Sequence, residues 1–139
     1  MKAVFVALAL AVSTLAQGVS ITQPPAGSTE KQGLPMTVVV QKQNSLTGSQ
    51  DVAVAIGLQS CGTASCDSLP TESVGPLLFS GEYAPKADAS GNVTQNYIVR
   101  VPAGMGPGPA RLSVAHFYIL GASEMAPMDV AHTTLNITA

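Results

Sequence analysis

The sequence predicts an all-β protein, an immunoglobulin-like antiparallel sandwich of about seven strands. After the first sixteen residues, short runs rich in Val, Thr and Ile alternate with clusters of Gly, Pro, Asn and Ser. No stretch there has the 3.6-residue apolar period of an amphipathic helix. Strands joined by turns rather than by crossover helices favour antiparallel pairing. Trp is absent, which excludes the Cys…Trp…Cys pattern of antibody domains. A Greek-key barrel is the alternative architecture.

The first three expected strands differ in how they are bounded. Pro24 and Pro25 end the first strand, because proline cannot donate to a strand ladder. The second strand carries a β-branched run and is followed by a polar stretch over 44–50. The third alternates strictly, with Val52, Val54, Ile56 and Leu58 on one face. Its other face holds only small residues, so another segment can pack closely on it. The expected strands are 19–22, 35–41, 51–60, 77–83, 93–101, 111–120 and 132–138.

The remaining four strands are separated by clear turn chemistry. Pro85 ends the fourth strand, and a turn over 88–91 leads into the fifth, which alternates. The stretch 102–109 holds three Pro and three Gly and is not expected to continue a ladder. The strand 111–120 is apolar on both faces, which predicts the centre of a sheet. A loop over 122–128 precedes the last strand.

The first sixteen residues have the pattern of a secretory signal peptide. Lys2 precedes an apolar run over 3–12, and small side chains stand at Thr14 and Ala16, where a signal peptidase reads. The run is shorter than the ~20 apolar residues that cross a bilayer. We therefore expect residues 1–16 to be removed and residues 17–139 to form a single secreted β-sandwich domain, without membrane insertion.

Charge and composition exclude several classes of partner. The net charge is −2, and charged residues make up 10% of the chain. Nucleic acids and anionic lipids are captured by clustered Lys and Arg, which this sequence lacks. Neither nucleic acid nor a charged membrane surface is an expected partner.

The two cysteines, Cys61 and Cys66, lie in a chain predicted to be exported and therefore in an oxidising compartment. Their spacing can also supply half of a metal site, but zinc needs four ligands, and His116 and His132 are distant in sequence. A disulfide is favoured, with free or intermolecular thiols as the alternative, and no metal or cofactor is expected. Closing a loop this short stabilises the folded state by only about 2 kcal/mol, so we expect the disulfide to act as a local pin that holds one loop and not the whole fold.

No catalytic motif is present, and the sequence predicts a protein that is not an enzyme. It has no G-x-S-x-G elbow and no phosphate-binding loop, and its eight acids show no readable pairing. A glycosidase needs two opposed carboxylates. His116 is interpreted as a buried side chain satisfied by a neighbouring backbone group rather than as a general base or ligand. His132 is interpreted as an edge residue that begins the last strand. No catalytic residue is assigned.

Two N-x-[ST] sequons are candidate glycosylation sites. They begin at Asn92, beside an expected turn, and at Asn136, near the end of the chain. Both lie next to strand ends, where a glycan can face solvent. The sequence therefore predicts a glycoprotein.

Four segments, in this order after a signal peptide, resemble the small secreted fungal effectors called necrosis-inducing secreted proteins. The segment Gly108–Ala122, GPARLSVAHFYILGA, carries the resemblance furthest. The other three are 51–61 with the second cysteine at 66, 75–85 and 95–102. The resemblance covers most of the chain after residue 16.

The resemblance implies a non-catalytic virulence protein that binds membrane-associated pattern-recognition kinases of a plant, suppresses immunity and can induce cell death. It implies plant receptor-like kinases as partners and an extracellular location, and leaves delivery into host cells open. The contact residues and the oligomeric state do not follow from it. A structural or glycan-binding cell-wall protein is the alternative, although that class uses exposed aromatic rings. The loops Cys61–Leu69 and Gly121–Val130 are the candidate contact sites, with closure of the sandwich ends as their structural alternative.

Overall fold

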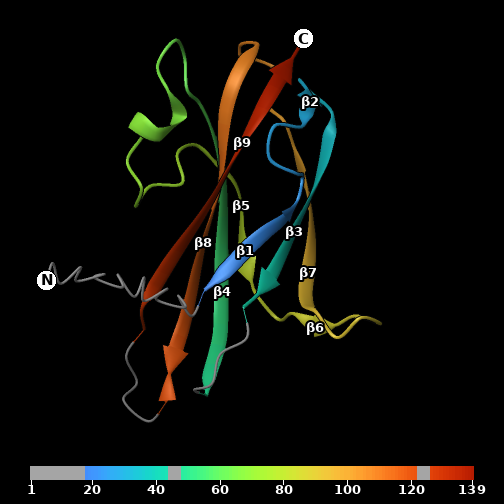
Figure 1. Ribbon diagram of the computed structural model, residues 1–139, viewed down its shortest axis with the longest axis vertical. Coiled ribbons are helices and arrows are strands. Elements are labelled where there is room, and N and C mark those ends of the chain that lie inside the picture. Colours follow the sequence, from blue (N-terminus) through green and yellow to red (C-terminus); the bar gives the residue numbers. More distant parts are fainter. Residues whose placement is uncertain (1–17, 44–47, 122–125) are drawn as a thin grey trace, which may run out of the picture.

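The computed structural model describes residues 18–43, 48–121 and 126–139 (Figure 1). The predicted signal peptide lies outside the described residues. Within these ranges the fold has nine strands and a short 3-10 helix, η1. They are β1 (Val19–Gln23), β2 (Thr29–Lys31), β3 (Pro35–Lys42), β4 (Ser49–Ser60), η1 (Cys66–Ser68), β5 (Leu77–Glu82), β6 (Lys86–Ala87), β7 (Val93–Arg100), β8 (Gly108–Leu120) and β9 (Met128–Thr138).

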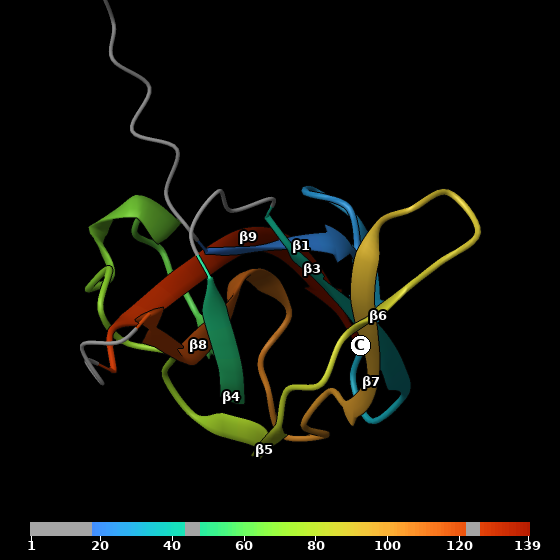
Figure 2. The same ribbon diagram turned by 90° about the horizontal axis from the view of Figure 1, so that it is seen from below.

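The strands form two sheets that face each other, which confirms the immunoglobulin-like sandwich and not the barrel. The four-stranded sheet has the order β1-β3-β7-β6, and the five-stranded sheet has the order β2-β9-β8-β4-β5. Seen from below, β4 and β8 lie in one layer, with β3 and β7 in the other (Figure 2). β2 and β6 are the two strands that the sequence did not predict. β2 also pairs parallel to β9, so the expected antiparallel pairing fails at that edge.

The core lies between the two sheets and is built from alternate residues of the long strands. Val54, Ile56 and Leu58 of β4 point into it, as their alternation predicted. Val52 does not, because the pairing of β4 with β8 shifts between Asp51 and Ala53 and leaves Val52 exposed. The other fully buried large side chains include Val38, Val40, Tyr83, Val101, Leu112, Val114, Leu135 and Ile137.

β8 is the central strand of the five-stranded sheet, as predicted for 111–120. It pairs with β4 on one side and with β9 on the other. The strand begins three residues earlier than expected, since Gly108 and Pro109 already pair with β9. β9 begins at Met128, four residues before the predicted start. No helix among the described residues has the length and apolar character to cross a membrane.

Candidate functional site

The segment between β4 and β5, residues 61–76, leaves the sheet and folds back over its outer face. We call it the excursion. It appears as the light-green segment of Figures 1 and 2, on the side of the five-stranded sheet turned away from β7. Cys61 and Cys66 form a disulfide within it, with their sulfur atoms 1.99 Å apart and their Cα atoms 5.0 Å apart. The predicted pairing is therefore confirmed. Ser65 caps η1 by accepting a hydrogen bond from the Asp67 amide.

Arg111 of β8 holds the second half of the excursion. Its side chain lies under the excursion and the residue is only 5% exposed. The guanidinium donates to the Leu69, Pro70 and Ser73 carbonyl oxygens, at 3.1, 2.5 and 3.4 Å. An arginine that donates to several carbonyls fixes their relative positions, because its donors have a rigid planar arrangement. No local sequence pattern indicates this role of Arg111.

Gly57 lets the end of the excursion return close to β4. A Cβ atom at this position would lie 2.1 Å from the carbonyl oxygen of Val74, so no side chain fits. The absent side chain allows the Leu58 amide to bond to the Pro76 carbonyl at 3.1 Å. This close approach is what the small-residue face of the third predicted strand indicated.

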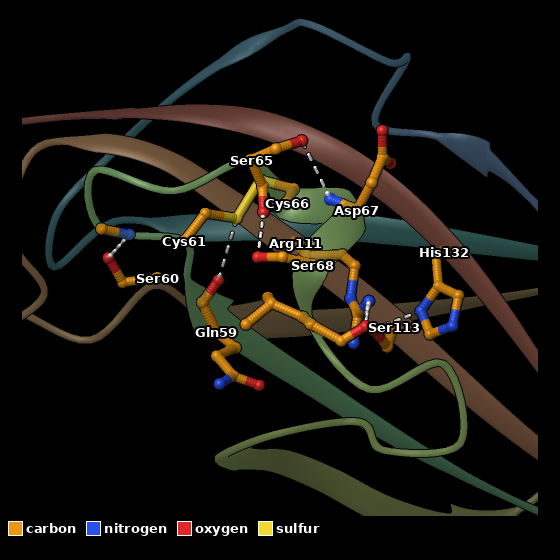
Figure 3. Close-up of a disulfide and its surroundings, with 12 residues drawn as sticks. Gln59, Ser60, Cys61, Ser65, Cys66, Asp67, Ser68, Arg111, Ser113 and His132 are labelled. Atoms are coloured by element: carbon orange, nitrogen blue, oxygen red, sulfur yellow. Dashed lines mark hydrogen bonds between the residues drawn. A yellow bond between two sulfur atoms is a disulfide. The ribbon is translucent and has the colours of Figure 1, made fainter.

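His132 connects β8, β9 and the excursion. The Ser113 hydroxyl lies 2.7 Å from its Nδ1 (Figure 3). The Thr71 carbonyl lies 2.8 Å from its Nε2. A carbonyl only accepts, so Nε2 carries the proton and Nδ1 accepts from the Ser113 hydroxyl. The prediction that His132 begins the last strand is wrong, because β9 begins at Met128. At His132, β9 pairs with β8, and its pairing with β2 is confined to residues 136–138.

A shallow hollow of about 480 Å³ lies between the excursion and β9. Its lining is mixed in charge and holds no Phe, Tyr or Trp ring. It consists of Ala26, Asp67, Thr71, Arg111, His132, Thr133 and Thr134. Ser113, next to this hollow, is 1% exposed, so its hydroxyl is closed to a substrate. The Ser113–His132 pair therefore does not meet the needs of nucleophilic catalysis. Among the described residues, no group of His, Cys, Asp and Glu can hold a metal ion.

A second polar cluster lies on the inner face of β8. Asp51 of β4 accepts from Lys42 Nζ at 2.7 Å and contacts His116 Nε2 at 3.0 Å. His116 is buried as predicted, but its partner is this carboxylate and not a backbone group. Burial outweighs the Asp51 hydrogen bond and lowers the pKa of His116 below its usual 6.5, so Nε2–H donates from a neutral ring.

The three tyrosines are all buried and serve the packing of the two sheets. Tyr83 donates to the Val40 carbonyl at 3.3 Å, and Tyr97 donates to the Glu82 carbonyl at 2.9 Å. Burial raises the pKa of both hydroxyls, that of Tyr97 to about 12. Tyr118 stacks on the His116 ring with centroids 5.0 Å apart. None of these rings can stack on a sugar.

The remaining predicted sites have simple surroundings. Asn92 is exposed in the turn before β7, where its side-chain oxygen accepts from Gln41 at 3.4 Å. Asn136 is exposed on β9. Glycosylation at either residue stays a prediction. The candidate loop Gly121–Val130 lies partly outside the described residues, over 122–125. Its end, from Met128, belongs to β9.

Comparison with known proteins identifies the family. The family model described as "Nis1 family" matches residues 15–136. A search of the curated proteins found no match. Among solved structures, the chain is similar to the fibronectin(III)-like modules of CbhA from Clostridium thermocellum. The two chains share 17% sequence identity with a TM-score of 0.43, over 86% of this chain and 93% of the other. With its model matched across nearly the whole chain, this protein belongs to the Nis1 family, the necrosis-inducing secreted proteins.

Proposed function

We propose that this protein is a non-catalytic effector that binds the membrane-associated pattern-recognition kinases of a plant host and thereby suppresses immunity. The observation that carries the proposal is the Nis1 family match over residues 15–136. Family membership implies a secreted, necrosis-inducing, effector-like protein of fungi. The kinase as target is the further step that we add.

The buried side chains favour binding over chemistry. Ser113 and His132 form a hydrogen-bonded pair, but Ser113 is closed to solvent and its partner is occupied on both ring nitrogens. His116 is only 2% exposed, and both oxygens of the Asp51 carboxylate are engaged, one by His116 and one by Lys42. A protein with these constraints acts through its surface, and its partner reads exposed loops and sheet faces.

A binding experiment separates this function from the glycan-binding alternative. The secreted protein is incubated with the purified cytoplasmic domain of a plant receptor-like kinase and, separately, with insoluble chitin and glucan. We expect retention by the kinase domain and a fall in its phosphorylation of a substrate peptide. We expect no retention on either polysaccharide, because all three tyrosines are buried and Phe117 is a single exposed ring without an aromatic partner for a sugar. Retention on a polysaccharide without kinase binding would contradict the proposal.

A further inference from the structure

The outer face of the five-stranded sheet carries an apolar patch that the excursion does not cover. Strand register places its residues in two adjacent rows across β4, β8 and β9. Ala53, Phe117 and Met128 are direct partners in one row, and Ala55, Ala115 and Val130 are direct partners in the next. Directly opposed residues point to the same face of a sheet. We call these six residues the outer patch, of which Ala115, only 4% exposed, forms the buried floor.

The outer patch is flat at its centre and raised at one side. The small side chains of Ala53 and Ala55 rise little above β4. Phe117 and Met128 project from the neighbouring strands and remain 38% and 44% exposed. The next row holds Gly57, Ser113 and His132, and there the excursion begins to cover the sheet. The patch therefore ends at a wall formed by the excursion. A phenylalanine beside an adaptable methionine is a typical anchor pair of a protein interface.

Acidic side chains lie on two sides of this patch, one on β5 and the others on the excursion. Glu82 of β5 is the direct partner of Ala53 and extends the first row. The Thr71 carbonyl bonds to His132, which places the exposed Glu72 at the wall next to β9, with Asp67 beyond it. None of these three acids forms an ion pair with another described residue.

Among the described residues, the basic side chains other than Arg111 lie outside the three strands of the patch. Lys42, Lys86 and Arg100 belong to strands of the four-stranded sheet. Lys31 belongs to β2, where it pairs with Thr138, and it therefore points to the outer face at the end of β9 opposite to Met128. Arg111 is the one arginine on this face, and its charge is buried against three carbonyls. The outer patch is therefore apolar in the middle and acidic on two of its sides. Such a pattern complements a surface with an apolar centre and basic edges.

We propose that the outer patch is the surface that docks the partner protein, and that the partner presents an apolar contact flanked by Lys or Arg. Phe117 and Met128 pack against the apolar contact of the partner. The small alanine side chains of β4 let the partner's chain approach the sheet closely. Glu72, Glu82 and Asp67 select the basic edges. This assignment rests on the proposed function, because the partner is taken to be the kinase.

The opposite face of the sandwich supplies a matched control. On the four-stranded sheet, Ile98 of β7 is 77% exposed, but its direct partner on β3 is Thr37 and its neighbours on the same face of β7 are Asn96 and Arg100. An apolar-to-serine change at Ile98 removes comparable apolar surface without touching the outer patch.

The first comparison measures the affinity of wild type, a patch variant and a control variant for the receptor-like kinase domain. The patch variant is Phe117→Ser with Met128→Ser, the control is Ile98→Ser, and both are checked for a cooperative thermal transition. We expect the patch variant to bind at least about tenfold more weakly, as loss of an interface anchor does, and Ile98→Ser to bind as wild type does. A charge variant, Glu72→Gln with Glu82→Gln, should associate more slowly, with weaker salt dependence. The control for the charge variant is Asp88→Asn. Its side-chain oxygen can still accept hydrogen bonds from the Ser90 and Asn92 amides.

A second readout does not require the kinase to be the partner. The same variants are expressed in leaves, and the oxidative burst triggered by a microbial elicitor peptide is recorded. We expect wild type and Ile98→Ser to suppress the burst and the patch variant to lose suppression. A folded patch variant that binds and suppresses as wild type does overturns the docking surface and leaves the function intact. If the patch variant does not fold, the charge variant decides on the same readouts. A wild type inactive in both assays overturns the proposed function together with this inference.

Discussion

The two faces of β8 carry two buried polar clusters with different duties. The inner cluster, built on Asp51 and His116, joins strands of both sheets, because Lys42 belongs to β3 and the other two residues belong to β4 and β8. The outer cluster, built on Arg111 and His132, ties the excursion to the sheet. Damage to the inner cluster should therefore weaken the whole sandwich, whereas damage to the outer one should release one segment.

Replacing Asp51 with alanine should have the largest effect. The change leaves Lys42 and the His116 Nε2–H without their shared acceptor. Removing one partner of a largely buried pair costs about 3 kcal/mol of the free energy of unfolding. Urea unfolding followed by circular dichroism measures this loss. Glu72→Ala, an exposed acid without an ion pair, is the control and should change stability by less than about 0.5 kcal/mol. An equal loss of unfolding free energy in the two variants would show that Asp51 contributes no more to stability than an exposed acid does.

Replacing Arg111 with methionine should have a smaller and more local effect. Three carbonyls lose a charged donor, which costs about 2.5 kcal/mol when the lost bonds involve an ionised group. Hydrogen exchange should speed up for amides of the excursion and stay unchanged in β3 and β7. A uniform increase across both sheets would show that the outer cluster supports the whole fold.

Replacing both cysteines with alanine tests the disulfide, which also holds the excursion in place. The loop between Cys61 and Cys66 is short, and its closure is worth about 2 kcal/mol. We expect the variant to fold and be secreted, with a lower thermal midpoint. In wild type, alkylation without reduction should label neither cysteine. Failure of the variant to fold at all would contradict the interpretation of the bridge as a local pin.

The smallest expected effect is a dependence of stability on pH. Burial lowers the pKa of His116 in the folded state below its usual 6.5, so the unfolded chain takes up a proton first as pH falls. Stability should therefore be complete above about pH 6.5 and decline below it, toward the lower pKa of the folded state. Urea unfolding over a pH series measures the slope. His116→Gln should flatten it, and His132→Gln is the matched control for loss of an imidazole. An unchanged slope in His116→Gln would assign the dependence to another group.

Sequence patterns predicted the fold because they are local. The alternation of the third strand placed Val54, Ile56 and Leu58 in the core, and the apolar strand 111–120 was correctly placed at the centre of its sheet. The disulfide also followed from two cysteines five residues apart. The short strands β2 and β6 were missed because two or three residues carry no readable period.

The polar clusters could not be predicted, because their partners are distant in the chain. His116 and Asp51 are 65 residues apart, and Arg111 lies about 40 residues from the carbonyls that it holds. Each pair is created by strand register, which also assembles the outer patch from three strands. A bulge between Asp51 and Ala53 sets that register, and alternation alone does not show it. One signal was available: the small-residue face of β4 indicated a close approach, which Gly57 makes.

The disulfide and the contacts of Arg111 and His132 hold the excursion without using the side chains at its tip, residues 62–65. Residues 62–65 are exposed and lie between the two bridged cysteines, while Arg111 and His132 hold the following stretch from below. A substitution at Thr63 or Ala64 therefore alters neither the sheet nor the anchors. This arrangement separates the part that is needed for folding from a part that tolerates substitution. The tip of the excursion is thus the place where related chains can differ in surface while keeping the same sandwich.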